Sequence, residues 1–267
     1  MYSNDIFKNI LLVYIASNFS KVKAELNTGS ELIIQSDKKL SEFTSIELGG
    51  KAKYFISCSN PGEIIDSYKF AESKNLPVQI LAGGSNVIFP DEGFEGLVIK
   101  IDLKGIEFYE EENIVFADIK AGEVWDDFVM SCIERDLTGL ECLSGIPGFA
   151  GATPIQNVGA YGQEISESLV SLKAIDRSSL EEIIFENKDC DFGYRQSRFK
   201  GRDKDKYIIT EVRFRFEKNK DPLIKYAELQ KSINSANNYK SAESIRDKLN
   251  IIRSKILELR RSKSMLE

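Results

Sequence analysis

The segment GLECLSGIPGFAGATPIQNVGAYG (residues 139–162) restricts the fold of this chain more than any other part of the sequence. It contains six of the 18 glycines and two of the six prolines. Both residue types disfavour the interior of a regular helix, and glycine also lets the backbone approach another group closely. We therefore expect a long ordered loop with close backbone contacts at this position.

Strand and helix patterns alternate on both sides of this loop. Asn60 and Pro61 predict the start of a helix, with Asn60 as its cap and with Ile64, Ile65, Tyr68 and Ala71 on its buried face. Apolar residues at helical spacing predict further helices over about 124–133 and 241–260. The predicted strands are residues 77–84, 96–101, 113–122, 169–176, 180–186 and 207–216. A β-α-β unit thus precedes the loop.

Composition excludes several kinds of site. The chain has no histidine and four scattered cysteines without a CxxC pair, which argues against a zinc site and against histidine-dependent nucleophilic catalysis. We expect the cysteines to be buried small apolar residues in a reducing compartment. The net charge of −6 argues against a broad nucleic-acid surface.

No apolar run reaches the length of a membrane span. The stretch ILLVYIA (residues 10–16) follows a lysine but lacks a small-residue cleavage site, so we interpret it as an N-terminal helix, or as the result of a wrongly assigned start, rather than a signal peptide.

A short glycine turn interrupts the apolar stretch LAGGSNVIF (residues 81–89). Successive N–H groups near glycine can form a concave site for an anion, and Ser85 and Asn86 add side-chain donors. No lysine follows as a P-loop requires, so a plain tight turn is the alternative. Taken together with the loop over 139–162, this turn favours one long ligand that contacts both segments.

Arg195 lies in the polar segment DFGYRQSRFK (residues 191–200). An arginine can bind a carboxylate through two parallel hydrogen bonds and can stabilise negative charge that develops on it. The alternative is a surface arginine in an ordinary salt bridge.

Three segments carry a resemblance to a known family: LAGGSNVIFPDEGFEGLVIK, SGIPGFAGATPIQNVGAYGQEI and CDFGYRQSRFK. Together they resemble UDP-N-acetylenolpyruvoylglucosamine reductase, a flavoenzyme of peptidoglycan precursor synthesis. The resemblance extends over residues 39–265 and includes DPLIKYAELQ and IRDKLNIIRSKILELRRSKSM.

The resemblance implies an α+β fold of the vanillyl-alcohol-oxidase/PCMH type, in which two subdomains bind FAD. Its boundaries here would be an N-terminal extension over 1–38, a first FAD-binding subdomain over 39–100, and a second subdomain over 101–267 that ends in a long helix.

The resemblance also assigns site residues. Arg195 matches the catalytic arginine that polarises the enolpyruvyl carboxylate, and Tyr161, Arg195, Tyr226 and Lys263 match substrate-binding positions. The matching cofactor-binding residues are Gly83, Gly84, Ser85, Asn86, Gly145, Ile146, Gly148, Gly151, Ala152, Thr153, Ile155, Asn157 and Gly159.

The implied reaction is the reduction of UDP-N-acetylglucosamine enolpyruvate to UDP-N-acetylmuramate. FAD would be the cofactor and NADPH the co-substrate, in the cytoplasm, without a nucleic-acid or membrane partner. Because the chain has no histidine, we expect FAD to be bound non-covalently.

The family pattern continues beyond RRSKSM into a third domain that binds substrate and supplies a serine proton donor and a glutamate. This sequence ends at Glu267, so the resemblance leaves Arg195 without those two partners and implies impaired turnover. A flavin-binding module or fragment without catalysis is the alternative function.

Overall fold

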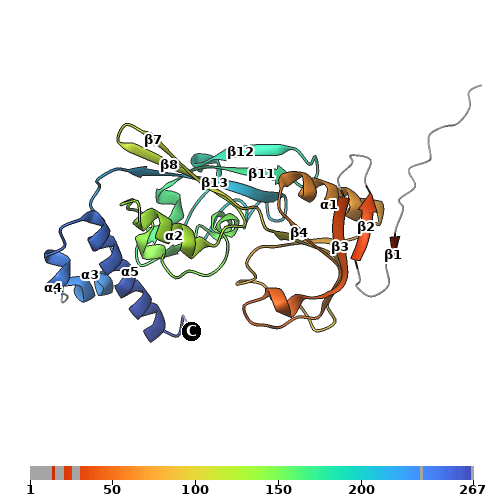
Figure 1. Ribbon diagram of the computed structural model, residues 1–267, viewed down its shortest axis with the longest axis horizontal. Helices are drawn as coiled ribbons and strands as arrows, with labels where there is room; N and C mark the ends of the chain where they lie inside the picture. Colours follow the sequence, from red (N-terminus) through yellow and green to blue (C-terminus); the bar gives the residue numbers. More distant parts are fainter. Residues whose placement is uncertain (1–13, 16–20, 26–30, 235–236, 266–267) are drawn as a thin grey trace, which may run out of the picture. The chain divides into compact units, whose positions relative to one another are not determined.

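The computed structural model describes residues 14–15, 21–25, 31–234 and 237–265. It divides into two compact units, Met1–Asp102 and Leu103–Glu267, and Figure 1 labels their main helices and strands. Most of the apolar stretch 10–16, interpreted above as a helix, lies outside the described residues; Tyr14 and Ile15 form a strand instead.

The first unit is a six-stranded sheet with the order β1-β2-β3-β4-β6-β5. Strands β4, β6 and β5 are parallel to one another, and the other neighbours are antiparallel. This arrangement confirms the predicted β-α-β unit. Its elements are β1 (Tyr14–Ile15), β2 (Lys21–Glu25), β3 (Glu31–Lys39), η1 (Leu40–Phe43), β4 (Lys51–Cys58), α1 (Pro61–Ser73), β5 (Val78–Leu81) and β6 (Phe94–Ile101).

Strand β3 corrects the extension expected over residues 1–38. Residues 31–38 are not separate from the first unit, because β3 pairs with β4 along the sheet and buries Leu32 and Ile34. The alternation of these two residues with an exposed Ile33 is the half-buried strand pattern.

Helix α1 begins as predicted. The Asn60 side chain accepts a hydrogen bond from the Glu63 N–H at 3.0 Å, which satisfies one of the free donors of the first turn. Ile64 and Ala71 are buried, whereas Ile65 and Tyr68 are only half-buried.

The second unit is built on a five-stranded antiparallel sheet with the order β12-β11-β13-β8-β7. Four of its strands match the predicted ranges within two residues at either end, and β7 was not predicted. The strands are β7 (Ile106–Glu111), β8 (Ile114–Lys120), β11 (Leu169–Asp176), β12 (Glu182–Glu186) and β13 (Tyr207–Glu217). The helices are α2 (Trp125–Ile133), α3 (Ala227–Asn234), α4 (Asn237–Lys240) and α5 (Ile245–Ser262).

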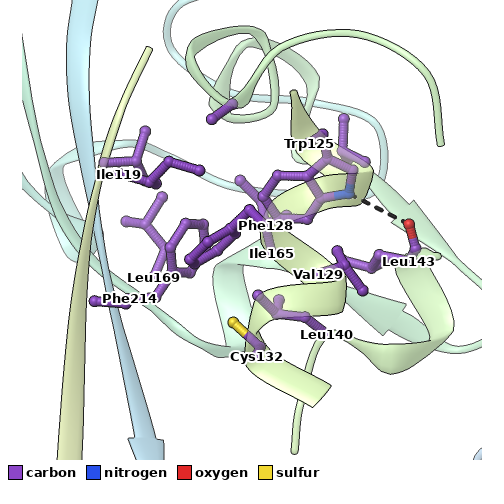
Figure 2. Close-up of a cluster of buried hydrophobic side chains, with 14 of the residues drawn as sticks. Ile119, Trp125, Phe128, Val129, Cys132, Leu140, Leu143, Ile165, Leu169 and Phe214 are labelled. Carbon is purple, nitrogen blue, oxygen red and sulfur yellow. Dashed lines mark hydrogen bonds between the residues drawn. The ribbon is translucent and has the colours of Figure 1, made fainter. Parts of the chain in front are cut away.

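An aromatic cluster joins helix α2 to this sheet (Figure 2). The ring of Phe128 lies 5.4 Å from that of Phe214 on β13, and Trp125 lies 5.9 Å from Phe214. The Trp125 indole also donates to the Leu143 carbonyl oxygen at 3.3 Å. The core therefore holds the first part of the glycine-rich segment as well as the sheet.

The glycine-rich segment is an ordered loop, as its composition predicted. Its short elements are η2 (Glu141–Leu143), η3 (Ala150–Ala152), η4 (Pro154–Gln156), β9 (Gly159–Ala160) and β10 (Gln163–Glu164), followed by η5 (Ile165–Glu167). A further turn, η6 (Asn187–Asp189), follows β12.

Asp126, at the start of α2, connects this loop to α5. Its Oδ1 accepts from the Gly145 N–H at 2.6 Å, and its two oxygens accept from Arg253 at 2.6 and 2.7 Å. Burial alone would raise the pKa of Asp126, but the Arg253 guanidinium and the Gly145 N–H outweigh it and lower that pKa below its usual range.

We expect Asp126→Asn to lower the free energy of unfolding by about 1.5–3 kcal/mol at pH 7, because the charged hydrogen bonds to Arg253 are weakened. The lowered pKa means that the ionised pair stabilises the fold above the unfolded-state pKa of about 3.9 and that this stabilisation is lost as the pH falls. Urea titrations at pH 6 and pH 3 should therefore show a smaller difference between wild type and variant at pH 3. An equal difference at both pH values would contradict this account.

Gly84, in the turn after β5, is required by the fold of the first unit. Its φ is +69°, and a Cβ placed on it would lie 1.8 Å from the Phe43 carbonyl oxygen. Gly83 does not have a positive φ. A side chain would therefore destabilise the first unit more at Gly84 than at Gly83.

We expect Gly84→Ala to destabilise the first unit by more than about 2 kcal/mol, since positive φ alone costs an alanine about 1–2 kcal/mol and the clash adds to it. Gly83→Ala is the matched control and should cost less than about 1 kcal/mol. Chemical denaturation followed by circular dichroism measures both. Equal losses would show that the contact with Phe43 relaxes without cost.

Candidate functional site

The turn Gly83–Asn86 has the free donors that an anion needs. Among the residues that the structure describes, none of the four backbone N–H groups donates a hydrogen bond, and the Gly84 carbonyl accepts from the Ser45 N–H at 3.1 Å. The side chains of Ser85 and Asn86 are exposed. These residues therefore fit a phosphate group that accepts from backbone and side-chain donors.

The glycines of the loop in the second unit hold it against the core. Gly145 and Gly148 have φ values of +71° and +108°, and the Gly148 carbonyl accepts from the Trp125 N–H at 3.0 Å. A Cβ on Gly151 would lie 2.4 Å from the Cβ of Ala121 at the end of β8. Close packing against the protein itself thus explains part of the glycine pattern.

Several predicted cofactor residues of this loop are also used by the fold. Ile146 and Ile155 pack against the core of the second unit, and the buried Thr153 donates its hydroxyl to the Ala150 carbonyl at 2.8 Å. Gly159 lies in β9, where a Cβ would come within 2.8 Å of the Glu164 side chain. Ala152 ends η3 and is half-buried.

Asn157 connects two hairpins that carry predicted substrate residues. It is 1% exposed, its φ is +44°, and its Nδ2 donates to Glu164 at 2.7 Å and to the Gly193 carbonyl at 3.1 Å. Its Oδ1 accepts from the Ser166 N–H at 3.2 Å. Because the whole amide is engaged, this side chain positions the loop, and a ligand would meet the backbone of Asn157 rather than its amide.

Arg195 occupies the tip of the second of these hairpins. Gly193 and Gln196 exchange two backbone hydrogen bonds of 3.0 Å, and Arg195 between them has a φ of +54° and an exposed side chain. Ser197, which follows the turn, donates to the Ile155 carbonyl at 2.6 Å. The hairpin is thus fixed to the glycine-rich loop while the guanidinium of Arg195 remains in solvent.

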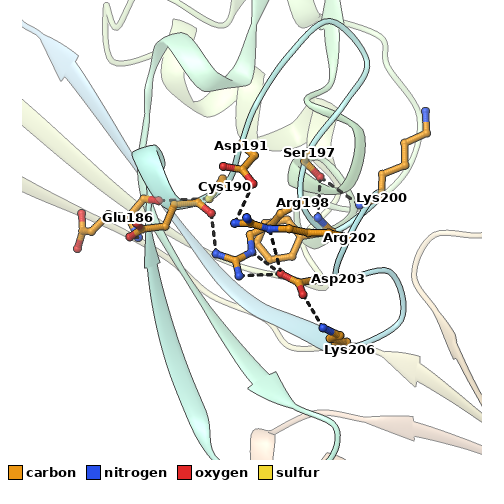
Figure 3. A network of polar contacts seen from close by, with 11 residues as sticks. Glu186, Cys190, Asp191, Ser197, Arg198, Lys200, Arg202, Asp203 and Lys206 are labelled. Atoms are coloured by element: carbon orange, nitrogen blue, oxygen red, sulfur yellow. Dashed lines mark hydrogen bonds and ion pairs between the residues drawn. The ribbon is translucent and has the colours of Figure 1, made fainter.

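A polar network holds the base of the Arg195 hairpin (Figure 3). Arg198 donates to Asp203 at 2.7 Å and to the Asp189 carbonyl at 2.8 Å, and its guanidinium stacks on Phe185. Asp203 is buried and also accepts from Lys206 at 2.8 Å. The guanidinium of Arg195 takes no part in this network, and the Lys200 ammonium donates to the Arg195 carbonyl at 3.0 Å.

The side chains of Tyr161, Tyr226 and Lys263, three of the four residues that the resemblance assigns to substrate binding, lie close together. The rings of Tyr161 and Tyr226 meet edge to face at 5.4 Å, and the Lys263 ammonium lies 5.8 Å from each ring centre. Lys263 also donates to Glu228 at 2.8 Å, which raises the pKa of this lysine. We call these three residues the tyrosine-lysine cluster; no contact among the described residues joins Arg195 to it.

The two-residue turn between β9 and β10 positions Tyr161 in the tyrosine-lysine cluster. Tyr161 and Gly162 both have positive φ and form the two-residue turn between β9 and β10, which is the hairpin turn expected for such a pair. A Cβ on Gly162 would lie 2.9 Å from the Lys225 side chain, so the turn lies directly against the segment before α3. Lys263 follows the last residue of α5.

Arg260 lies beside the glycine-rich loop and was not predicted as a site residue. It is 7% exposed in the last turn of α5, and a Cβ on Gly145 would lie 3.2 Å from its Nε. The available signal was its spacing: Arg260 follows Ile252 and Ile256 by steps of four and therefore falls on the buried stripe of α5.

Several carboxyl and thiol groups of the two units are buried in the fold. Glu141 is 1% exposed and accepts from the Gly139 N–H at 2.6 Å and from Gln163 at 2.8 Å; burial raises its pKa. All four cysteines are free and buried, as predicted, and burial raises the pKa of Cys58 to about 12.

Within the described part of the chain, no group of three or more acidic, cysteine or histidine side chains could hold a metal ion. No helix in this part is long and apolar enough to span a membrane.

Comparison with known proteins identifies the fold and its relatives. Residues 52–179 match the family described as FAD binding domain. The crystal structure of UDP-N-acetylenolpyruvylglucosamine reductase from Thermus caldophilus superimposes with a TM-score of 0.60 at 19% identity, over 84% of this chain and 68% of that chain. A Physcomitrella patens BBE-like 1 protein gives a TM-score of 0.51 at 12% identity, over 70% and 42% of the two chains. The predicted α+β FAD-binding fold is confirmed.

Relatives found by sequence have a higher identity to this chain than these two structures have. The UDP-N-acetylenolpyruvoylglucosamine reductase of Thermobifida fusca is 39% identical over 229 residues, which are 85% of this chain and 62% of that protein. The reductase of Flavobacterium johnsoniae is 42% identical over 69% of this chain and 54% of its own length. This chain therefore spans between about half and three fifths of the length of these relatives. The resemblance seen in its motifs is confirmed: the chain is similar in sequence to the UDP-N-acetylenolpyruvoylglucosamine reductases, and its residues 52–179 match the FAD binding domain family.

Proposed function

We propose that this chain binds FAD and takes part in the NADPH-dependent reduction of UDP-N-acetylglucosamine enolpyruvate to UDP-N-acetylmuramate. The observation that carries the proposal is the 39% identity to a named reductase over 85% of the chain, which extends over all three motif segments. The free N–H donors of Gly83–Asn86 support it, because they suit a phosphate of the cofactor. The reaction would belong to peptidoglycan precursor synthesis and would thereby serve wall growth, cell shape and cell division. We place it in the cytoplasm, a reducing compartment in which free cysteines stay reduced.

Some of the predicted cofactor residues would contact FAD directly, and the others would hold the glycine-rich loop in place. In the first unit, Gly83–Asn86 would donate to phosphate oxygens of FAD. In the second unit, the backbone of Gly145–Gly148 and of Asn157 would meet the flavin. When bound, FAD supplies the hydride chemistry. Gly151, Thr153, Ile155 and Gly159 support this loop through the packing described above.

The substrate residues are cations and aromatic side chains. Arg195 would pair with the carboxylate of the enolpyruvyl group and stabilise the negative charge that increases there during reduction. Its exposure and its fixed hairpin suit a group that meets substrate from solvent. Lys263 in the tyrosine-lysine cluster would neutralise a phosphate of the UDP-sugar, while the rings of Tyr161 and Tyr226 flank it.

Acid precipitation of the purified, FAD-loaded protein tests the cofactor. We expect yellow flavin in the supernatant, because the chain has no histidine for a covalent link and its four cysteines are buried. Flavin that stays in the pellet, or a protein that takes up no added FAD, would contradict the proposal.

We expect Gly83→Val to weaken FAD affinity at least about tenfold, since a branched side chain would block access to the N–H donors. Arg195→Ala should leave FAD affinity unchanged and should weaken binding of UDP-N-acetylglucosamine enolpyruvate about tenfold, the value of one charged contact. Flavin fluorescence and calorimetry measure the two affinities. Equal losses of FAD affinity in both variants would refute the division of roles.

A further inference from the structure

Two buried side chains join the ends of the glycine-rich loop. Gln163 on β10 accepts from the Cys142 N–H at 2.8 Å and donates to Oε1 of Glu141 at 2.8 Å. Oε2 of Glu141 accepts from the Gly139 N–H at 2.6 Å. Glu141 is 1% exposed and Gln163 is 5% exposed. All the cofactor residues that the resemblance assigns in the second unit lie between Cys142 and Gln163.

The two ends of this hydrogen-bonded chain restrict the groups in its middle. Gly139 and Cys142 each present a backbone N–H, which can only donate. An ionised carboxylate accepts on both oxygens, whereas an amide accepts at one end and donates from the other. One carboxylate and one amide therefore satisfy both N–H groups and each other. Two amides always bring two donors into contact. A protonated Glu141 meets the same conflict, because its hydroxyl needs the acceptor that Gln163 gives to Cys142.

The charge of Glu141 is stabilised by hydrogen bonds. Burial raises the pKa of Glu141, while the N–H donors of Gly139 and Gln163 favour its charged form. The titratable side chains on which Glu141 acts are Cys132 of α2, Cys142 of η2 and Tyr239 of α4; Glu167 and Lys225, which act on Cys142, pair with each other at 2.7 Å. Burial raises the pKa of these two thiols and of this phenol, so none of the three changes its charge between pH 5 and pH 8.

We propose that Glu141 is a positioning residue for the cofactor: as a carboxylate it accepts from Gly139 and Gln163 and holds the two ends of the glycine-rich loop in the arrangement that receives FAD. The inference rests on the proposed function, which assigns this loop to FAD. The bond from the Gly145 N–H to Asp126 fixes the interior of the loop, whereas the Glu141–Gln163 pair joins its ends. Because Glu141 is buried, it acts through Gln163 and the backbone.

Three variants test the pattern of donors and acceptors. Glu141→Gln places two amides in the chain. Gln163→Glu places two carboxylates there, which satisfy both backbone donors only when they share one proton. The exchange variant combines both substitutions, so that one amide and one carboxylate are present in the opposite order. Thr210→Val is the matched control, because it removes a buried hydroxyl of β13 that donates to the Lys173 carbonyl at 3.3 Å.

We expect Glu141→Gln to weaken FAD affinity at least about tenfold, since the loop ends separate to relieve the donor–donor contact and FAD must bring them together again. The exchange variant and Thr210→Val should bind FAD within about threefold of wild type. Flavin fluorescence measures the affinities. Visible circular dichroism of the bound flavin should be the same in the exchange variant as in wild type and altered in Glu141→Gln.

Gln163→Glu should show a pH dependence that wild type lacks. Two adjacent carboxylates that share a proton have a raised pKa, above the unfolded-state value of about 4.3. Their contribution to stability is therefore present at low pH and is lost as the pH rises through the folded-state pKa. The thermal midpoint of this variant without ligand should lie further below that of wild type at pH 8 than at pH 5.

Wild-type FAD affinity in Glu141→Gln, even with a lower thermal midpoint, would overturn the inference, because Glu141 would then only stabilise the fold. An exchange variant that binds FAD as weakly as Glu141→Gln would also overturn it, as would an equal gap in thermal midpoint at both pH values for Gln163→Glu. If Glu141→Gln does not fold, these last two variants decide. A wild-type chain that takes up no FAD would instead refute the proposed function, so the wild-type titration distinguishes the two failures.

Discussion

The carboxylate of Asp126 is the interaction on which the second unit's site depends. It binds the side chain of Arg253 on α5 and the backbone of Gly145 at the same time, and it sits at the start of α2, whose other side lies in the aromatic core. Asp126 thus connects the aromatic core, the glycine-rich loop and helix α5. The last turn of α5 then brings Arg260 and Lys263 to the glycine-rich loop.

Partner exchange at Lys263 follows from this arrangement. Its bond to Glu228 is an exposed ion pair, and such pairs contribute about 0–1 kcal/mol. An incoming phosphate could replace Glu228 at little cost.

Local signals in the sequence predicted local structure well. The Asn60-Pro61 pair marked the start of α1, and the glycine density of residues 139–162 marked an ordered loop. The structure places Tyr161, Tyr226 and Lys263 close together, and their role in substrate binding stays a proposal. The sequence could not predict which groups already have partners within the protein. The side-chain amide of Asn157 is hydrogen-bonded to Glu164 and Gly193, and Gly84 packs against the backbone of Phe43. Those facts depend on contacts between segments far apart in sequence.

The pairing of β3 with β4 has a practical consequence for anyone who divides this chain. The match to the FAD binding domain begins at residue 52, inside β4, so a fragment cut there would lack β3 altogether. Strand β4 would then present a row of unpaired N–H and C=O groups at a new sheet edge, and the hydrophobic surface beneath Leu32 and Ile34 would be open to water. Such an edge is a template for association with other chains. If such a fragment lost solubility, the cause would therefore be the absence of β3 rather than the absence of a cofactor.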